Sequence, residues 1–221
     1  MTTAIIVAAG RSTRMGAGID KAFLSLVNKP VIAWSLLAFE RCADIDRIVL
    51  VVRKDQIMAS KAVVKMFGIS KLDKIVAGGA RRQDSVKAGL EACELDTRYV
   101  LVHDGARPCI ASETISEVVA AVKRQPAVTL ARRVTDTLKR VPKGVIVAGT
   151  EDRSKLWSAQ TPQGFQMGVL RKAYAALKEE VSDDCQAVEL AGEVVRVIEN
   201  NKPNFKITTA EDLQLAAAIL K

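Results

Sequence analysis

The sequence has few aromatic residues and a single histidine, and none of its cysteines form a closely spaced pair. The four cysteines, Cys42, Cys93, Cys109 and Cys185, contain no CxxC pair, which argues against a zinc site and against a disulfide framework. Each is expected to be a small buried or half-buried hydrophobic residue. Aromatic residues make up only 4% of the chain, which disfavours a surface that stacks nucleic-acid bases.

Long hydrophobic runs are also missing. No apolar stretch approaches the roughly 20 residues needed to cross a bilayer. The apolar segment Ala4–Ala9 is short and has no basic region before it, so it does not resemble a secretory signal. The 221 residues suit one domain spanning 1–221, expected to be mature, cytoplasmic and without a membrane partner.

What the chain does have is positive charge: 33 Lys and Arg against 25 Asp and Glu, a formal charge of +8. Such a balance favours anionic partners, either nucleic acid or phosphorylated metabolites. The most suggestive basic residues follow apolar strands in loops, and interleaved aromatics are scarce. Small phosphorylated ligands are therefore favoured over nucleic acid.

Aliphatic runs alternate with helical patterns along the first 131 residues. Buried strands are expected at Ala4–Ala9, Arg47–Val52, Lys74–Ala77, Tyr99–His103 and Ala127–Ala131. Helices are expected from Pro30, over Gln56–Phe67, after a cap at Asp84, and from a cap at Ser112 to Val122. The alternation predicts βαβ units and a three-layer α/β fold around a mostly parallel sheet.

This rhythm breaks at about residue 132. Val134–Lys139, Val145–Ala148 and Lys155–Ala159 have the pattern of short strands at spacings typical of an antiparallel meander. A small antiparallel sheet is marginal by itself, so this β-arm (residues 132–160) is expected to pack on a partner subunit and form a dimer.

The remaining C-terminal segment returns to helices and one strand. The expected elements are a helix near Met167–Lys178, one opened by Asp183 or Asp184, a strand at Val194–Ile198, and a helix opened by a Thr209/Asp212 capping box.

Three loops follow strands and are expected to meet beyond the carboxyl edge of the sheet, where such folds bind ligands. The first, Gly10–Lys21, lacks the GxxxxGK[ST] order of a P-loop and the glycines of a dinucleotide fingerprint. It offers backbone N–H groups and the cations Arg11, Arg14 and Lys21, which suit a phosphate site. Transfer at a nucleotide α-phosphorus needs such neutralising charge, usually with Mg²⁺.

The other two loops add polar groups. Gly78 and Gly79 permit close approach of the backbone to a ligand, and Arg82 and Ser85 lie at a helix N-terminus that suits anions. A plain turn with an N-cap explains that pattern equally well. In the third loop Asp104 directly follows a strand, where a carboxylate suits a hydroxyl, a ribose or a Mg²⁺-bound phosphate.

Single residues in these and later segments are ambiguous taken one at a time. His103 has the pattern of a structural residue at a strand end more than of a catalyst. Arg107 can pair either with Asp104 or with a substrate phosphate. By residue type alone Thr137, Arg153 and Lys206 are solvated surface residues.

Six segments of the chain together resemble the 2-C-methyl-D-erythritol 4-phosphate cytidylyltransferase family, which belongs to the non-mevalonate pathway of isoprenoid precursor synthesis. In order along the chain, the segments are AAGRSTRMG…DKAFL, GGARRQDSV, VHDGARP, VTDTLKR, LWSAQTPQGF and NFKITTAEDL. VHDGARP and TPQ are specific, whereas AAG…RMG is shared by many sugar nucleotidyltransferases. The resemblance implies a Rossmann-like domain of the nucleotide-diphospho-sugar transferase type, with a protruding β-arm that interlocks a homodimer. Ser12 departs from the family's usual glycine and Asp20 from its frequent proline.

The resemblance also implies a role for each matched residue. The residues matched to catalysis are Arg14, Lys21, Arg153 and Lys206. Those matched to CTP binding are Ala8, Ala9, Gly10, Gly79, Ser85, Asp104 and Gly105, and Arg82 is added to this set because it lies at the same helix N-terminus as Ser85. Those matched to the acceptor are Asp104, Arg107, Thr137, Arg153 and Lys206, with Thr137 and Arg153 reaching in from the partner's β-arm. Asp104 is also matched to Mg²⁺, directly or through the CTP phosphates.

The implied reaction is in-line attack by a phosphate oxygen of methylerythritol phosphate on the α-phosphorus of CTP, with pyrophosphate leaving. Three alternatives remain at this point. A ribitol 5-phosphate cytidylyltransferase shares fold and chemistry, a basic nucleic-acid-binding module fits the charge, and a nicotinamide-dependent oxidoreductase is disfavoured by the missing GxGxxG.

Overall fold

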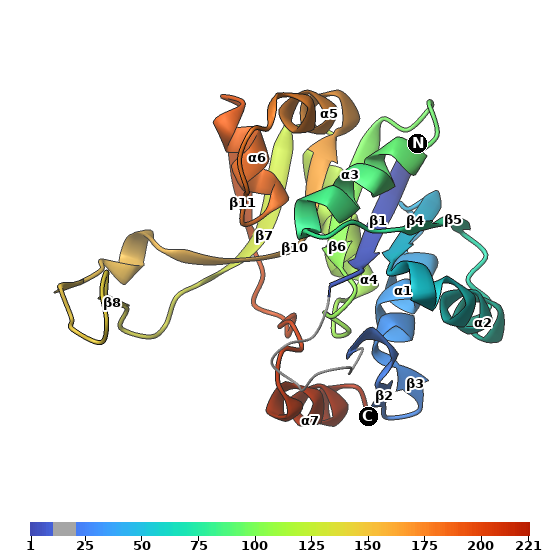
Figure 1. The fold of residues 1–221 in the computed structure, drawn as a ribbon, viewed down its shortest axis with the longest axis horizontal. Coiled ribbons are helices and arrows are strands. Elements are labelled where there is room, and N and C mark those ends of the chain that lie inside the picture. The colour runs from blue at the N-terminus through green and yellow to red at the C-terminus, as the bar shows by residue number, and fades with distance from the viewer. Residues whose placement is uncertain (11–20) are drawn as a thin grey trace.

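The computed structural model describes residues 1–10 and 21–221, which form a central sheet with helices on both faces (Figure 1). The sheet has seven strands in the order β11-β7-β10-β6-β1-β4-β5. These strands are β1 (Thr2–Ala8), β4 (Arg47–Val52), β5 (Leu72–Ala77), β6 (Tyr99–Asp104), β7 (Ala127–Arg133), β10 (Trp157–Gln166) and β11 (Val195–Glu199). Only β10 runs against its neighbours β6 and β7. The prediction of a mostly parallel α/β sheet is confirmed.

Helices cover both faces of this sheet and make it the middle of three layers. One face carries α1 (Val31–Arg41), α2 (Ile57–Phe67) and α4 (Ser112–Val122). The other carries α3 (Arg82–Ala92), α5 (Met167–Ala176) and α6 (Asp184–Leu190). The α7 helix (Ala210–Ile219) packs below the sheet against the hairpin of β2 (Ser25–Leu26) and β3 (Lys29–Pro30). No helix within the described ranges is long and apolar enough to cross a membrane.

The continuous aliphatic runs explain the central strands. In β1, Ala4 and Ile6 face the layer of α1, α2 and α4, whereas Ile5 and Val7 face the layer of α3, α5 and α6. Because successive side chains of a strand point to opposite faces, a strand covered on both sides favours apolar residues at successive positions. The same alternation holds in β4 and β6, so these runs fix the middle of the sheet.

The prediction that Lys155–Ala159 is a short strand of the antiparallel β-arm is wrong. Only its last three residues, 157–159, are in a strand, and they begin β10, a ten-residue strand inserted between β6 and β7 in the main sheet. The sequence WSAQTPQGFQ has no aliphatic run, so its burial could not be recognised from hydrophobicity. Its polar side chains Gln160, Thr161 and Gln163 are buried and hydrogen bonded instead.

Two helix caps and two short strands also differ from expectation. The N-cap of α3 is Arg81, and Asp84 is the third helical residue, which accepts a hydrogen bond from the Arg81 backbone N–H. The N-cap of α4 is Ala111, one residue before Ser112. Val145–Ala148 forms no strand, and of the predicted strand Val134–Lys139 only Lys139 lies in one. Asp183 does cap α6, and Thr209 with Asp212 forms the predicted capping box of α7.

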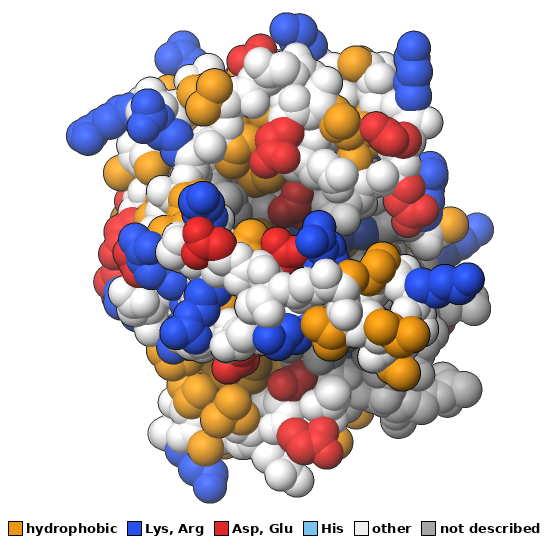
Figure 2. Space-filling view, turned by 90° about the vertical axis from the view of Figure 1, so that its left-hand side faces the viewer, with side chains coloured by type: hydrophobic (Ala, Val, Ile, Leu, Met, Phe, Trp, Pro, Cys, Tyr) orange, Lys and Arg blue, Asp and Glu red, His pale blue; other side chains and the backbone are white. Residues whose placement is uncertain are grey.

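Residues 134–156 of the β-arm project away from the sheet as an extended excursion (Figure 1). The excursion contains the short pair β8 (Lys139–Arg140) and β9 (Gly149–Thr150) and a single 3-10 turn, η3 (Arg153–Lys155). Its tip exposes aliphatic side chains: Val145 is 94% and Ile146 78% accessible. Figure 2 views the molecule from the side on which the β-arm projects and shows apolar side chains among charges of both signs.

Candidate active site

A cavity opens where the loops after β1, β5 and β6 meet at the carboxyl edge of the sheet. Its lining comes from the β1 loop, the 3-10 turn η1 (Lys21–Phe23), the α3 N-terminus, the end of β6 and the segment before α7. The described residues that line it are Val7, Ala8, Ala9, Gly10, Lys21, Ala22, Gly79, Ala80, Arg81, Arg82, Ser85, Asp104, Ala106 and Lys206. The convergence expected from the parallel topology is therefore present.

The β5–α3 loop approaches the β1 loop so closely that only glycine fits. A Cβ atom added at Gly78 would lie 2.4 Å from the Ala9 Cβ and 2.6 Å from the Ser85 Oγ. The Ser85 hydroxyl accepts the Gly79 N–H at 3.2 Å, which holds the loop against the first turn of α3. The glycine pair thus lets the backbone form one wall of the cavity.

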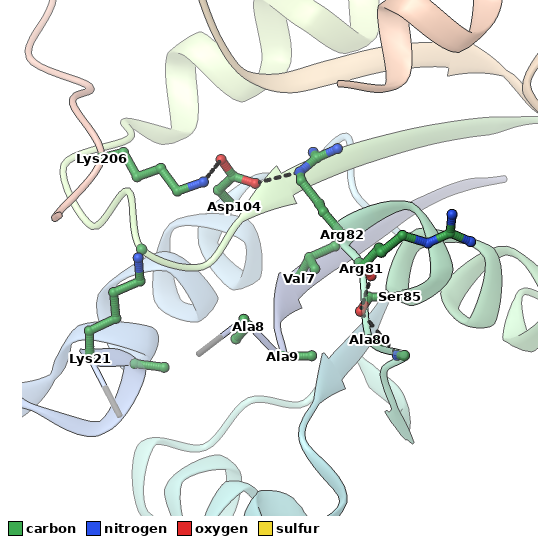
Figure 3. Close-up of a pocket in the computed structure, with 14 residues that line it drawn as sticks. Val7, Ala8, Ala9, Lys21, Ala80, Arg81, Arg82, Ser85, Asp104 and Lys206 are labelled. Carbon is green, nitrogen blue, oxygen red and sulfur yellow. Dashed lines mark hydrogen bonds and ion pairs between the residues drawn. The ribbon is translucent and has the colours of Figure 1, made fainter. Parts of the chain in front are cut away.

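Asp104 is the acidic centre of the cavity (Figure 3). Arg82 Nε donates to its Oδ1 at 3.1 Å, and Lys206 Nζ donates to its Oδ2 at 2.9 Å. Arg107 Nε lies 3.8 Å from the same Oδ2. Lys21 extends into the space beside this group, whereas the Arg81 guanidinium points away from it (Figure 3). The lining is thus strongly cationic around one carboxylate.

These contacts fix the charge of Asp104. Burial by itself would raise its pKa, but the charges of Arg82, Lys206 and Arg107 outweigh burial and hold the pKa well below its ordinary value. The pKa of Arg82 is lowered by burial but raised further by Asp184 and Asp104, so the net direction is upward. Both groups are charged at neutral pH.

His103 lies behind Asp104 and is fully buried. Its Nε2 is 3.4 Å from the Arg107 carbonyl oxygen, which can only accept, so Nε2 carries the hydrogen. Its Nδ1 then accepts from the Thr161 hydroxyl at 3.1 Å, and the same hydroxyl oxygen accepts the Asp104 N–H at 3.0 Å. Burial lowers the pKa of His103 to about 3, although the charge of Asp104 opposes this shift. A neutral ring with both nitrogens engaged fits a structural residue.

Most of the residues predicted for the site from the sequence are brought together here. Those in the cavity lining are Ala8, Ala9, Gly10, Lys21, Gly79, Arg82, Ser85, Asp104 and Lys206. Gly105 lies just behind, where a Cβ would meet the Ile32 Cδ1 at 2.5 Å. Arg107 lies in an adjoining pocket that shares Arg82, Asp104 and Lys206 with the cavity, and its Nη1 donates to the Asn204 carbonyl at 2.7 Å.

Two of the predicted residues that the structure describes do not line the cavity of their own chain, and a third predicted residue falls outside the described ranges. Arg14 lies outside the described residues. Thr137 and Arg153 are exposed on the β-arm, where Arg153 Nη1 donates to the Thr135 carbonyl oxygen.

Sequence reasoning missed several groups beside the cavity. Asp184 is fully buried and accepts a hydrogen bond from Arg82 Nη2 at 2.9 Å. Gln163 supports the same region: its Oε1 accepts the Asp184 N–H at 3.2 Å, and its Nε2 donates to Asp183 Oδ2 at 2.8 Å. The sequence signals for these groups are the polar residues within β10 and the two adjacent aspartates at the start of α6, of which a capping pattern explains only one.

A cationic cavity beyond the carboxyl ends of parallel strands, in a three-layer α/β fold, is the arrangement of an enzyme that handles nucleotides or other phosphorylated ligands. Comparison with known proteins narrows this class. The family model of 2-C-methyl-D-erythritol 4-phosphate cytidylyltransferase matches residues 2–221. The chain therefore belongs to the 2-C-methyl-D-erythritol 4-phosphate cytidylyltransferase family, whose members are enzymes of isoprenoid biosynthesis.

Individual relatives agree with this assignment over most of their length. The chain is 41% identical over 222 residues to the 2-C-methyl-D-erythritol 4-phosphate cytidylyltransferase of Alkaliphilus metalliredigens, covering 99% of the chain and 92% of the relative. It is 42% identical over 218 residues to that of Dehalococcoides mccartyi, covering 99% and 95%.

Solved structures show the same similarity. The 4-diphosphocytidyl-2C-methyl-D-erythritol synthase of Anaerococcus prevotii superposes with a TM-score of 0.86 at 31% identity, covering 99% of the chain and 95% of that structure. The 2-C-methyl-D-erythritol 4-phosphate cytidylyltransferase of Thermus thermophilus superposes with a TM-score of 0.80 at 32% identity, covering 98% and 97%. These matches favour the cytidylyltransferase over ribitol phosphate transfer, nucleic-acid binding and nicotinamide redox chemistry.

Proposed function

We propose that the chain transfers CMP from CTP to 2-C-methyl-D-erythritol 4-phosphate, giving 4-diphosphocytidyl-2-C-methyl-D-erythritol and pyrophosphate. The observation that carries the proposal, beside the family, is the meeting of Lys21, Arg82 and Lys206 around Asp104 at the carboxyl edge of the sheet. Two phosphorylated substrates must approach each other in this reaction, and their mutual repulsion requires such a concentration of cations.

The nucleotide fits the part of the cavity formed by the β1 loop and the start of α3. Ala8, Ala9 and Gly10 present backbone there, and α3 directs the positive end of its dipole toward the same space. Lys21 lies across from them, so that its ammonium group can offset charge on the α-phosphate and the departing pyrophosphate (Figure 3). Arg14 is proposed for the same role from the sequence alone.

The acceptor fits the adjoining side, where Arg107 and Lys206 lie near Asp104. Lys206 and Arg153 are proposed to hold the phosphate of the acceptor, and Asp104 to accept a hydroxyl of the acceptor or of the ribose. Both carboxylate oxygens of Asp104 already bond to cations, which fixes their direction before a ligand binds.

Mg²⁺ is the proposed cofactor, and the donor set indicates how it would be held. Among the described residues no cluster of three or more His, Cys, Asp or Glu side chains could form a metal cage. Asp104 is the one carboxylate in the described cavity lining, and it is ionised. This fits a Mg²⁺ ion held mainly by CTP phosphate oxygens with at most one protein carboxylate, Asp104. When bound, the ion neutralises charge on the triphosphate.

The reaction needs no covalent enzyme intermediate. An ionised phosphate oxygen of the acceptor forms the new bond to the α-phosphorus of CTP. The bond from that phosphorus to the bridging oxygen breaks in line with it, and its electron pair leaves with pyrophosphate. The protein's part is then to align the two phosphates and to stabilise charge with Lys21, Arg14, Lys206 and Arg153.

The β-arm is proposed to join two copies into a homodimer and to complete the partner's site. The support is its projection away from the sheet, the exposed Val145 and Ile146 at its tip, and the position of Thr137 and Arg153 on it rather than in the cavity lining. Apolar side chains this exposed commonly mark an interaction surface.

The enzyme is proposed to act in the cytoplasm, the usual compartment of CTP and of proteins with free cysteines.

Pyrophosphate release from CTP tests the reaction. We expect release with 2-C-methyl-D-erythritol 4-phosphate and Mg²⁺, and a large loss when Mg²⁺ is chelated. Ribitol 5-phosphate at equal concentration is the matched acceptor control, and faster release with it would overturn the acceptor assignment. No release with either acceptor would overturn the proposed function.

A further inference from the structure

Asp184 has no local reason to be a buried carboxylate. The capping of α6 is provided by its neighbour: Asp183 Oδ1 accepts the Gln186 N–H at 2.9 Å. The Asp184 side chain is 0% exposed, and a buried charge of this kind is costly unless it is paired. Its partners are Arg82 Nη2 at 2.9 Å and the Tyr174 hydroxyl at 2.6 Å. The carboxylate therefore faces the active site and not its own helix.

Arg82 connects this carboxylate to the cavity. Its Nε donates to Asp104 while its Nη2 donates to Asp184, so one edge of the planar guanidinium is divided between two carboxylates. The Nε and Nη2 edge of an arginine usually binds a single carboxylate through two parallel hydrogen bonds. Because the guanidinium of Arg82 is bonded to a carboxylate at each of these two nitrogens, its plane is fixed. The direction from which its Nε donates to Asp104 Oδ1 is therefore fixed as well.

We infer that Asp184 is a positioning residue that acts through Arg82 to orient Asp104, with the Tyr174 hydroxyl holding Asp184 in turn. Tyr174, Asp184, Arg82 and Asp104 form a continuous series of contacts from α5 through α6 and α3 to the end of β6. Of these four residues, only Arg82 and Asp104 line the cavity. The inference rests on the proposed function because Asp184 and Tyr174 affect turnover only through Asp104.

The variants Asp184→Asn and Tyr174→Phe test this inference. The first keeps the shape of the side chain and removes its charge, and the second removes only the hydroxyl. Matched controls are Asp44→Asn, a partly exposed carboxylate that lies 3.8 Å from Lys123, and Tyr99→Phe, the other tyrosine of the chain, at the opposite end of β6 from Asp104. The readouts are kcat and KM for both substrates, measured below the melting temperature of each variant.

We expect Asp184→Asn to lower kcat/KM by roughly 10- to 100-fold, the range seen when an outer partner of a functional side chain is removed. Tyr174→Phe is expected to lower it less, and both controls to match the unmodified enzyme. If Asp184→Asn proves unable to fold, Tyr174→Phe decides. Unchanged kcat and KM in a folded variant, with only a lowered melting temperature, would reduce Asp184 to a structural role and overturn the inference.

A double variant separates action through Arg82 from an independent effect. Arg82→Lys keeps the positive charge but removes the fork that joins the two carboxylates. If Asp184 acts only through Arg82, adding Asp184→Asn to Arg82→Lys should lower kcat/KM no further. Additive losses would overturn the inference while leaving the proposed function intact. An unmodified enzyme that releases no pyrophosphate would overturn both.

Discussion

The ammonium group of Lys206 lies 2.9 Å from Asp104 Oδ2, although 102 residues separate the two in the chain. The pair places a hydrogen-bond donor and an acceptor side by side at the boundary between the cavity and its adjoining pocket. A ligand that carries both a phosphate and hydroxyl groups can contact both at once. This geometry suits a phosphorylated polyol better than a bare anion.

Lys21 is expected to affect the chemical step more than substrate binding. Lys21→Ala should lower kcat by about 100-fold or more, the scale on which one preorganised donor to a transition state contributes. The matched control is Lys61→Ala on the exposed side of α2, which should leave kcat unchanged. Steady-state pyrophosphate release measures both, and a Lys21→Ala enzyme with near-normal turnover would remove Lys21 from the catalytic group.

Mixing two inactive variants tests whether the β-arm works in the partner's site. Arg153→Ala and Lys206→Ala should each be nearly inactive with methylerythritol phosphate. In a mixed dimer with two-fold symmetry, one site joins an intact cavity to an intact β-arm. After subunit exchange at equal amounts, about a quarter of full activity should return, because half the dimers are mixed and each has one intact site.

The same mixture gives a clear opposite outcome. If Arg153 acts within its own chain, no combination restores an intact site and activity stays at the level of the single variants. Light scattering during size-exclusion chromatography checks the dimer independently, and a monomer at working concentration would contradict the proposed assembly.

Gly78 should tolerate no side chain. In Gly78→Ala the added methyl would overlap the Ala9 and Ser85 side chains, so the two loops must separate. We expect a loss of about 1 to 3 kcal/mol in the free energy of unfolding, the usual cost of overpacking, and a raised KM for CTP. Gly168→Ala in α5 is the control, because nothing lies within 4 Å of its Cβ, and it should be neutral or stabilising. Equal behaviour of the two variants in denaturant titrations would contradict the close-approach argument.

His103 should make the protein less stable as the pH falls below neutrality. In the folded chain its pKa is about 3, below the ordinary 6.5, so between these values the unfolded state binds the extra proton. Above pH 6.5 the ring is neutral in both states and its contribution is complete. At pH 5 the free energy of unfolding should be about 2 kcal/mol lower than at pH 7.5. Replacement by glutamine should remove this part of the slope, and parallel pH curves for the two proteins would refute the assignment.

Much of the scaffold of the site could be predicted from local sequence. The aliphatic runs of β1, β4 and β6 predict strands buried on both faces, and parallel strands bring their following loops to one edge. Gly79, Ser85 and Asp104 therefore meet as predicted. The exception is β10, whose buried Gln160 and Gln163 are satisfied by partners distant in the chain, and no periodicity reveals such partners.

By itself the sequence determined the class of fold, the edge of the sheet that carries the site and, through its motifs, the family. Short-range patterns suffice to predict these features because the burial of a strand and the spacing of a helix depend on residues close together in the sequence. Only the tertiary structure decided that Lys206 and Arg82 hold Asp104 between them, and that Asp184 lies behind Arg82. The physical reason is that ion pairs between residues about a hundred positions apart depend on how the layers pack, and packing leaves no local pattern in the chain.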